Sequence, residues 1–252
     1  MAGSPVLTTR SLGLDIGGAT IVADVSLDVN DGELLGIIGP NGAGKTSLFN
    51  LLSGIYRPTS GAVALDGRDI TRQRPARRTR LGLGRTFQVS NVFPLLSVLE
   101  NVRLAAEARL GGTMRIWRRA TSVRAALDRA RDALDRVGLG DRMDAQAGQL
   151  SHGDKRKLEL AMLLAADPHV ILLDEPMAGV SAEDVPELVE LIRSVHRGGR
   201  KTVLMVEHHM DVVTGLAERI AVMHHGALLA VDTPAAIMAN PTVQAAYLGE
   251  EL

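Results

Sequence analysis

The sequence predicts an α/β fold in which a mainly parallel sheet is interrupted by a helical segment. Short continuous apolar runs at residues 34–38, 170–173 and 202–206 are typical of strands that are buried on both faces. Helical stretches precede or follow each run, and this alternation favours an α/β sheet. From about residue 91 to residue 165 helical patterns continue with almost no strand signal, which predicts a helical subdomain inserted into the α/β core.

Length and composition narrow the class of protein before any motif is considered. The 252 residues, 46% of them hydrophobic, suffice for one domain or for a core with a subdomain. Lys and Arg total 28 and Asp and Glu total 29, and the net charge of −1 argues against a dedicated nucleic-acid binder. The absence of cysteine excludes disulfides, thiolate zinc sites and cysteine nucleophiles. No apolar run approaches the roughly 18 residues of a membrane span and the first residues lack a signal-peptide pattern, so we expect a soluble cytoplasmic protein.

Shorter patterns predict the remaining strands and helices. Alternating apolar residues at 25–29 indicate a half-buried strand. Apolar residues that lead into a glycine-containing turn predict two hairpins, one at residues 63–67 and one at residues 220–229. An apolar stripe predicts one packed helix face that ends near Gly138, and it consists of Val123, Leu127, Ala130, Leu134 and Val137.

A basic stretch lies between the predicted strands and the helical subdomain. Its arginines are Arg72, Arg74, Arg77, Arg78 and Arg80. Pro75 near the start and Gly82 after the end predict a short surface helix. We expect its basic side chains to be solvated, and the alternative is a nucleic-acid or lipid-headgroup site.

The strongest chemical signal is the stretch Gly39–Thr46, which matches GxxxxGK[ST]. It follows a buried strand and precedes a helical run, which is the context that a phosphate-binding loop requires. Glycines let the backbone turn tightly, and its N–H groups with the helix N-terminus form an anion cradle. Lys45 can reach the β- and γ-phosphates, and the Thr46 hydroxyl can bind Mg²⁺. The nucleotide-binding candidates in this stretch are Asn41, Gly42, Ala43, Gly44, Lys45, Thr46 and Ser47.

A second signal is the pair Asp174-Glu175 at the end of the apolar run 170–173. Ligands bind at the carboxyl ends of strands in open α/β sheets. Asp174 can hold Mg²⁺ directly or through water, and Glu175 can orient or deprotonate the water that attacks the γ-phosphate. The alternative is an acidic pair that caps a helix, and the phosphate loop in the same chain favours the catalytic interpretation.

Three further positions join these candidates. Leu150-Ser151-His152-Gly153-Asp154 precedes an apolar helical run, so Ser151 and Asp154 predict a capping box, and the helix N-terminus is also a second candidate anion site. Gln88, where the strand region gives way to the helical segment, could sense the metal or the attacking water. His208 follows the run 202–206 and could contact a γ-phosphate.

Taken in order, these motifs resemble the nucleotide-binding subunit of an ABC transporter. The motifs are GPNGAGKT, RTFQ, LSHGD, ILLDEP and VEHHM, and they span nearly the whole chain. The resemblance implies an α/β fold with a P-loop NTPase (RecA-like) core, an antiparallel β subdomain and an inserted α-helical subdomain. It assigns residues 1–90 and 166–252 to the core with the β subdomain and residues 91–165 to the helical subdomain. It also implies an ATPase whose ATP and Mg²⁺ are enclosed by two subunits, with Ser151 and Gly153 of one closing the loop of the other.

The chain departs from the family pattern at four positions. His152 and Asp154 stand in LSHGD where the family commonly has LSGGQ. Ile16 stands where an aromatic residue usually stacks on adenine, so we expect an apolar contact with the base. Ser181 stands where a loop near the second subunit usually ends in Asp, and this departure concerns communication between sites rather than ATP binding.

The resemblance also indicates cargo and partners. The stretch 85–102 and the DEPMAG run are similar to importers of branched-chain amino acids, and the SHG signature and residues 245–249 are similar to urea and short-amide importers. It implies transmembrane permease subunits that dock near residues 88–94, with Val92 and Phe93 exposed. It further implies a second ATP-binding subunit, in a homo- or heterodimer, and an indirect link to a periplasmic binding protein. It implies no nucleic-acid partner and a location on the inner face of the bacterial plasma membrane.

Three rival classes remain open on the sequence alone. An ABC ATPase of a lipid or lipopolysaccharide exporter would have the same fold. A non-transport ABC ATPase acting on DNA or ribosomes typically has two motif sets or a long coiled coil, and this chain has one set with too little sequence for such an arm. A kinase or GTPase would leave LSHGD unexplained, and no NKxD motif occurs.

Overall fold

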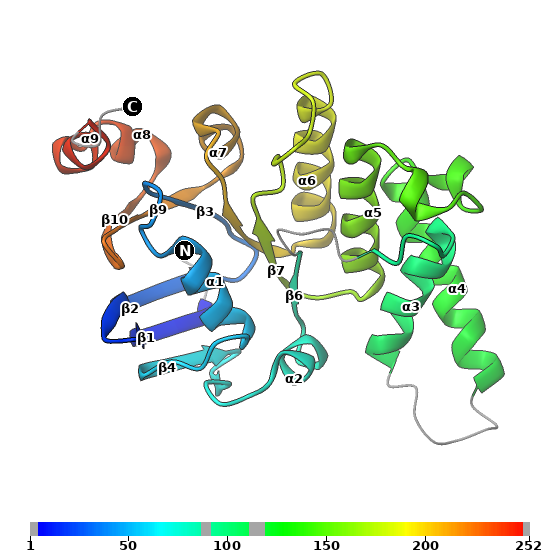
Figure 1. The fold of residues 1–252 in the computed structure, drawn as a ribbon, viewed down its shortest axis with the longest axis horizontal. Helices are drawn as coiled ribbons and strands as arrows, with labels where there is room; N and C mark the ends of the chain where they lie inside the picture. Colours follow the sequence, from blue (N-terminus) through cyan, green and yellow to red (C-terminus); the bar gives the residue numbers. More distant parts are fainter. Residues whose placement is uncertain (1–4, 87–91, 111–118, 249–252) are drawn as a thin grey trace. The chain divides into compact units, whose positions relative to one another are not determined.

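The computed structural model describes residues 5–86, 92–110 and 119–248, and the chain forms two compact units. The first unit comprises residues 1–83, 169–175 and 193–252, and the second comprises residues 84–168 and 176–192. Figure 1 shows the elements of each unit. The subdomain boundaries given by the family resemblance remain a prediction.

A mainly parallel sheet forms the centre of the first unit. Its strands within this unit follow the order β10-β9-β3-β8-β7. They are β3 (Leu34–Ile38), β7 (Val170–Asp174), β8 (Thr202–Val206), β9 (Arg219–His224) and β10 (Ala227–Asp232). Every residue of β3, β7 and β8 is buried, as their continuous apolar sequence predicts. These three strands and β9 pair in parallel, while β10 pairs antiparallel with β9. A short strand β6 (Leu83–Arg85) begins where the chain passes into the second unit.

A second, antiparallel sheet belongs to the same unit, with the order β2-β1-β4-β5. Figure 1 labels its strands β1, β2 and β4. Its strands are β1 (Pro5–Ile16), β2 (Ala19–Asn30), β4 (Ser60–Leu65) and β5 (Arg68–Asp69). The alternation predicted at 25–29 is present, because the buried residues Val25, Leu27 and Val29 are separated by exposed residues. Both predicted hairpins are confirmed by the pairs Leu65–Arg68 and His224–Ala227, so His224 ends a strand and the turn is His225-Gly226.

Helix α1 (Lys45–Ser53) shares one hydrophobic core with both sheets. Leu48, Phe49, Leu51 and Leu52 are its buried apolar side chains. The same core contains residues of β1 and β2 and of β3, β7 and β8, so packing fixes the helix that follows the phosphate loop. The unit also contains α2 (Pro75–Arg80), α7 (Met210–Leu216), α8 (Pro234–Met238) and α9 (Pro241–Leu248), while α6 (Val185–Gly199) has residues in both units.

The arginine stretch forms the predicted short helix α2, but one of its side chains is not solvated. Arg78 is only 1% exposed. Its guanidinium donates to the carbonyls of Leu51 and Leu52 at 2.7 and 2.6 Å, and to those of Thr71 and Gln73 at 3.0 and 3.1 Å. Burial lowers the pKa of Arg78 to about 10, so it stays charged at neutral pH. The prediction was wrong for this residue because Arg78 satisfies carbonyls at the C-terminal end of α1.

The second unit is helical, as its sequence predicts (Figure 1). It contains α3 (Val98–Leu110), α4 (Arg119–Arg136), α5 (His152–Ala165) and two short 3₁₀ helices, η2 (Gly140–Arg142) and η3 (Ala147–Gln149). Ala130, Leu134 and Val137 of the predicted stripe are buried, whereas Val123 is 37% exposed, so the packed face begins later than predicted. Gly138 follows α4 with φ 73°, which is the expected glycine C-cap. Over the described part of the chain, no helix combines the length and the apolar character needed to cross a membrane.

Candidate nucleotide-binding site

The register of the parallel strands brings three predicted segments to one edge of the sheet. Ile37 of β3 pairs with Val206 of β8, and Val206 also pairs with Asp174 of β7. Because these strands are parallel, their carboxyl ends lie side by side. The phosphate loop, Glu175 and His208 each follow one of these ends, so these three candidates lie at the same edge of the sheet.

Two glycines of the phosphate loop, Gly39 and Gly44, could not be replaced without a shift of the backbone around them. A Cβ atom on Gly39 would lie 2.2 Å from the carbonyl oxygen of Met223, and one on Gly44, at φ +94°, would lie 2.8 Å from that of Ile21. The loop is tied to the β9–β10 turn, since the N–H of Gly226 donates to the carbonyl of Ala43 at 3.1 Å. Gly44 is the N-cap of α1 and has no side chain to cap it, so the helix N-terminus is suited to an anion.

Lys45 lies over this loop. Its Nζ donates to the carbonyls of Gly39 at 2.6 Å and Pro40 at 2.8 Å, and the residue is 6% exposed. Asn41 and Gly42 are exposed, Ala43 is buried, and Thr46 and Ser47 are half-buried. A charged ammonium beside inward-facing backbone and a helix N-terminus is the combination that binds phosphate.

Glu175 and His208 meet at the same edge. Oε1 of Glu175 lies 3.0 Å from Nε2 of His208, which is hydrogen-bond distance. Glu175 has φ 48°, an uncommon conformation for a residue with a side chain, and its N–H donates to the carbonyl of Val206 at 2.9 Å. Glu175 is 20% exposed and His208 is 44% exposed, so both can be reached by water and by a ligand. A carboxylate held in this way can accept a proton from a water molecule.

Two oxygen donors of the first unit fit a magnesium ion. Asp174 is fully buried at the end of β7, and Thr46 lies in the first turn of α1. Mg²⁺ prefers oxygen ligands and is usually held by one or two protein groups together with phosphates and waters. The donor chemistry of Thr46 and Asp174 therefore fits Mg²⁺ that arrives with a nucleotide.

Ser151 is the N-cap of α5 in the second unit, as predicted. Its Oγ accepts a hydrogen bond from the N–H of Asp154 at 3.1 Å. The Asp154 carboxylate lies 3.6 Å from Nη1 of Arg142, so a cation offsets the charge that this departure from the family pattern introduces. Ser151 is exposed and Gly153 is half-buried. The capped helix start is therefore open to a ligand or a partner.

Other predicted positions differ in how far the structure describes them. Ile16 is 51% exposed at the end of β1, where an apolar contact with a base is accessible. Phe93 is 54% exposed as expected, but the expectation for Val92 was wrong, since Val92 is half-buried rather than exposed. The Ser181 hydroxyl donates to Oδ2 of Asp184 at 2.7 Å. Gln88 lies outside the described residues.

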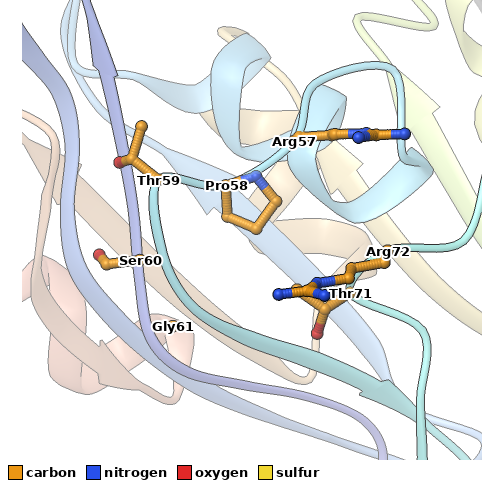
Figure 2. Close-up of a pocket in the computed structure, with 7 residues that line it drawn as sticks. All are labelled: Arg57, Pro58, Thr59, Ser60, Gly61, Thr71 and Arg72. Atoms are coloured by element: carbon orange, nitrogen blue, oxygen red, sulfur yellow. The ribbon is translucent and has the colours of Figure 1, made fainter.

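A pocket of about 490 Å³ in the first unit contains none of the predicted site residues (Figure 2). Its lining residues are Arg57, Pro58, Thr59, Ser60, Gly61, Thr71 and Arg72. Hydrogen bonds from Thr71 and the charge of Arg72 lower the pKa of Asp69, so this neighbouring carboxylate partly offsets the charge of Arg72. Because none of the candidate nucleotide-binding residues lines this pocket, we do not assign it to the nucleotide.

Sequence reasoning missed two residues that support the site. Glu207, between β8 and His208, is 2% exposed, and the signal for it was an acidic residue directly after a buried strand. Gly226 holds the phosphate loop through Ala43, which lies 183 positions earlier in the chain (226 − 43), and no local pattern indicates that contact.

The fold and this edge define a P-loop nucleotide-binding protein, and comparisons with known proteins specify its family. Residues 22–178 match the family model "ABC transporter", and residues 227–252 match "Branched-chain amino acid ATP-binding cassette transporter". The chain belongs to the ABC transporter family as an ATP-binding subunit, and it is an ATPase that powers transport. The predicted family and fold class are thereby confirmed.

Individual relatives cover almost the whole chain. The high-affinity branched-chain amino acid transport ATP-binding protein LivG of Salmonella typhimurium is 40% identical, over 98% of this chain and 98% of its own. Its counterpart BraF of Pseudomonas aeruginosa is 36% identical over the same shares. An ATP-binding cassette of an ABC transporter in its ADP conformation superposes with a TM-score of 0.84 at 27% identity, covering 98% of this chain and 99% of that one. A dimeric bacterial ABC transporter cassette gives 0.77 at 25% identity, covering 90% and 98%.

Proposed function

We propose that this chain is the ATP-hydrolysing subunit of an importer for branched-chain amino acids or related small amides. Two observations support the cargo class: the match of residues 227–252 to the branched-chain amino acid cassette model, and the names of relatives that align along the full chain. Under this proposal, residues 91–165 form the helical subdomain and the rest forms the core with the β subdomain.

The single observation that carries the catalytic proposal is the shared sheet edge, where the phosphate loop, Glu175 and His208 follow aligned strand ends. The loop residues 41–47 with Lys45 bind the phosphates. Thr46 and Asp174, with Gln88, hold Mg²⁺, which supplies charge neutralisation when bound. Glu175 orients and deprotonates the attacking water, and His208 contacts the γ-phosphate. Ile16 contacts adenine through apolar surface.

The proposal includes a second ATP-binding subunit. Ser151 and Gly153, at the open N-terminus of the 14-residue helix α5, close the phosphate loop of that subunit, which can be a second copy or a related chain. The dimeric cassette to which this chain is similar supports that arrangement. Phe93 and its exposed neighbour Leu95 form the surface that contacts transmembrane permease subunits. Those subunits hold the chain on the inner face of the bacterial plasma membrane. They also connect it indirectly to a periplasmic binding protein.

Uptake by a reconstituted transporter tests the cargo. The chain is assembled with its membrane subunits and binding protein in proteoliposomes, and ATP-dependent uptake of radiolabelled leucine, urea and acetamide is measured. We expect uptake of leucine or of a short amide, and none with Glu175→Gln. ATP-driven movement of lipid in the opposite direction, with no uptake of either solute class, would contradict the proposal and favour an exporter.

A further inference from the structure

Glu207 is a buried carboxylate that the proposed reaction does not yet use. It follows β8 directly and is 2% exposed, whereas His208, the next residue, has a side chain that is 44% exposed. Burying a carboxylate is costly unless hydrogen-bond donors satisfy it. Its burial at the catalytic edge therefore depends on the donors that it binds.

One oxygen of Glu207 lies within hydrogen-bond distance of three nitrogen atoms of the two residues that follow it. Oε2 accepts the N–H of His208 at 2.8 Å and the N–H of His209 at 3.3 Å, and it lies 3.0 Å from Nδ1 of His209. Hydrogen bonds to a charged acceptor are stronger than those between neutral groups. The backbone at 208–209 is thus fixed by a side chain that is itself held in the buried core.

Within the described part of the chain, the imidazole of His208 has one hydrogen-bond partner, Glu175, so the direction of the ring depends on the backbone that carries it. An exposed ring receives little packing, so its direction follows from its Cα position and from the contact with Glu175 at 3.0 Å. Glu175 is tied to the same stretch, since its N–H donates to the carbonyl of Val206 at 2.9 Å. The carbonyl of Val206 therefore holds Glu175, while the backbone fixed by Glu207 carries the imidazole that contacts it.

We propose that Glu207 is a positioning residue for ATP hydrolysis, which fixes the backbone from which His208 reaches Glu175. This inference rests on the roles proposed above for His208 and Glu175. The competing explanation is that the Glu207 carboxylate only stabilises the start of α7, where an acidic group is favourable. The two explanations differ in what happens to the catalytic rate.

Two variants at position 207 distinguish the effect of the hydrogen-bond acceptor from the effects of charge and side-chain volume. Glu207→Met keeps the length of the side chain but removes the acceptor, and we expect kcat to fall roughly 10- to 100-fold with KM for ATP little changed, because a small displacement of a catalytic group has this effect. Glu207→Gln keeps an acceptor oxygen, so we expect it to restore kcat to within about threefold of the wild type. Steady-state hydrolysis by the full chain, direct titration with a fluorescent ATP analogue and thermal unfolding are measured for each.

Glu33 provides the matched control for a merely structural effect. It is 4% exposed in the same unit, accepts the N–H of Asn30 at 2.8 Å and pairs with Arg219 at 3.1 Å. Glu33→Met should lower the melting temperature while kcat stays within about twofold. If Glu207→Met behaves as Glu33→Met does, losing stability alone, the positioning role is overturned. Should Glu207→Met not fold, Glu207→Asp, which withdraws the carboxylate by one methylene, must still lower kcat, and an unchanged kcat would overturn the proposal.

A double variant distinguishes failure of this inference from failure of the proposed catalytic roles. If Glu207 acts through His208, Glu207→Met combined with His208→Ala should hydrolyse ATP no more slowly than His208→Ala alone. Independent, multiplying effects would refute the positioning role and leave His208 in place. If His208→Ala itself retains full activity, the proposed role of His208 is wrong.

Discussion

Replacing Glu175 by Gln isolates the chemistry of the carboxylate from its geometry. An amide has nearly the same shape, and its oxygen can still accept from Nε2 of His208, so the contact now at 3.0 Å can persist. The base and its charge are lost, and removal of a general base typically costs about 10²-fold or more. That is about 2.7 kcal/mol or more of transition-state free energy at 1.36 kcal/mol per tenfold. Lys45 and the phosphate loop belong to another segment, so we expect the affinity for ATP to stay within about threefold.

The assay is phosphate release at saturating ATP, paired with a titration of a fluorescent ATP analogue and with gel filtration in ATP. The chain supplies a matched control, because Oε1 of Glu218 lies 3.1 Å from Nε2 of His196. The Glu218 N–H bonds to the carbonyl of Leu34, at the start of β3 and thus away from its carboxyl end. Glu218→Gln should leave hydrolysis unchanged, whereas Glu175→Gln should hydrolyse ATP at least about 10²-fold more slowly and elute as an ATP-bound dimer. Hydrolysis by Glu175→Gln within about threefold of the wild type would refute its role as the base.

Three further substitutions test separate parts of the structure. Lys45→Ala removes the ammonium over the phosphate loop and should weaken ATP binding roughly 10- to 100-fold in a direct titration, and unchanged affinity would contradict the phosphate cradle. Arg78→Met removes the hydrogen bonds to the end of α1. It should lower the free energy of unfolding, measured by urea denaturation, by about 3–4 kcal/mol. The control is Arg77→Met at the exposed neighbouring residue, which should change that free energy by less than about 0.5 kcal/mol. Ser151→Ala removes a helix cap at a cost of about 1 kcal/mol in stability, and hydrolysis should fall further than this loss explains if Ser151 also binds nucleotide.

Much of the fold was predictable because its signals are local. The buried runs at 34–38, 170–173 and 202–206 are strands whose every described residue is buried, and their continuous apolar character has no other common explanation at that length. The phosphate loop was predictable for the same reason, since its glycines and its strand–helix setting lie within a few residues of one another. The contact between Glu175 and His208 is not a local signal. Predicting it requires the further inference that β7 and β8 are neighbouring parallel strands.

What the sequence could not indicate are side chains that bind backbone groups from distant segments. Arg78 reaches carbonyls 26 and 27 positions away, and by local pattern it is one more basic residue of a surface helix. Val123 shows the converse, because the helical period predicts a packed side chain that the structure leaves exposed. In both cases tertiary contacts decide, and a one-dimensional pattern carries no information on which neighbour is present.

The same distinction separates the two levels of the candidate site. Residues that touch the reacting groups are constrained by chemistry, so their type and spacing are visible along the chain, as with Lys45 and Glu175. A residue that holds them, such as Glu207, needs only a buried acceptor at a strand end, and an amide or a different cap could meet that need. Its role becomes visible only when the nitrogen atoms around Oε2 are identified. The catalytic rates of Glu207→Met and Glu207→Gln therefore test this role, whereas the residue type at position 207 does not reveal it.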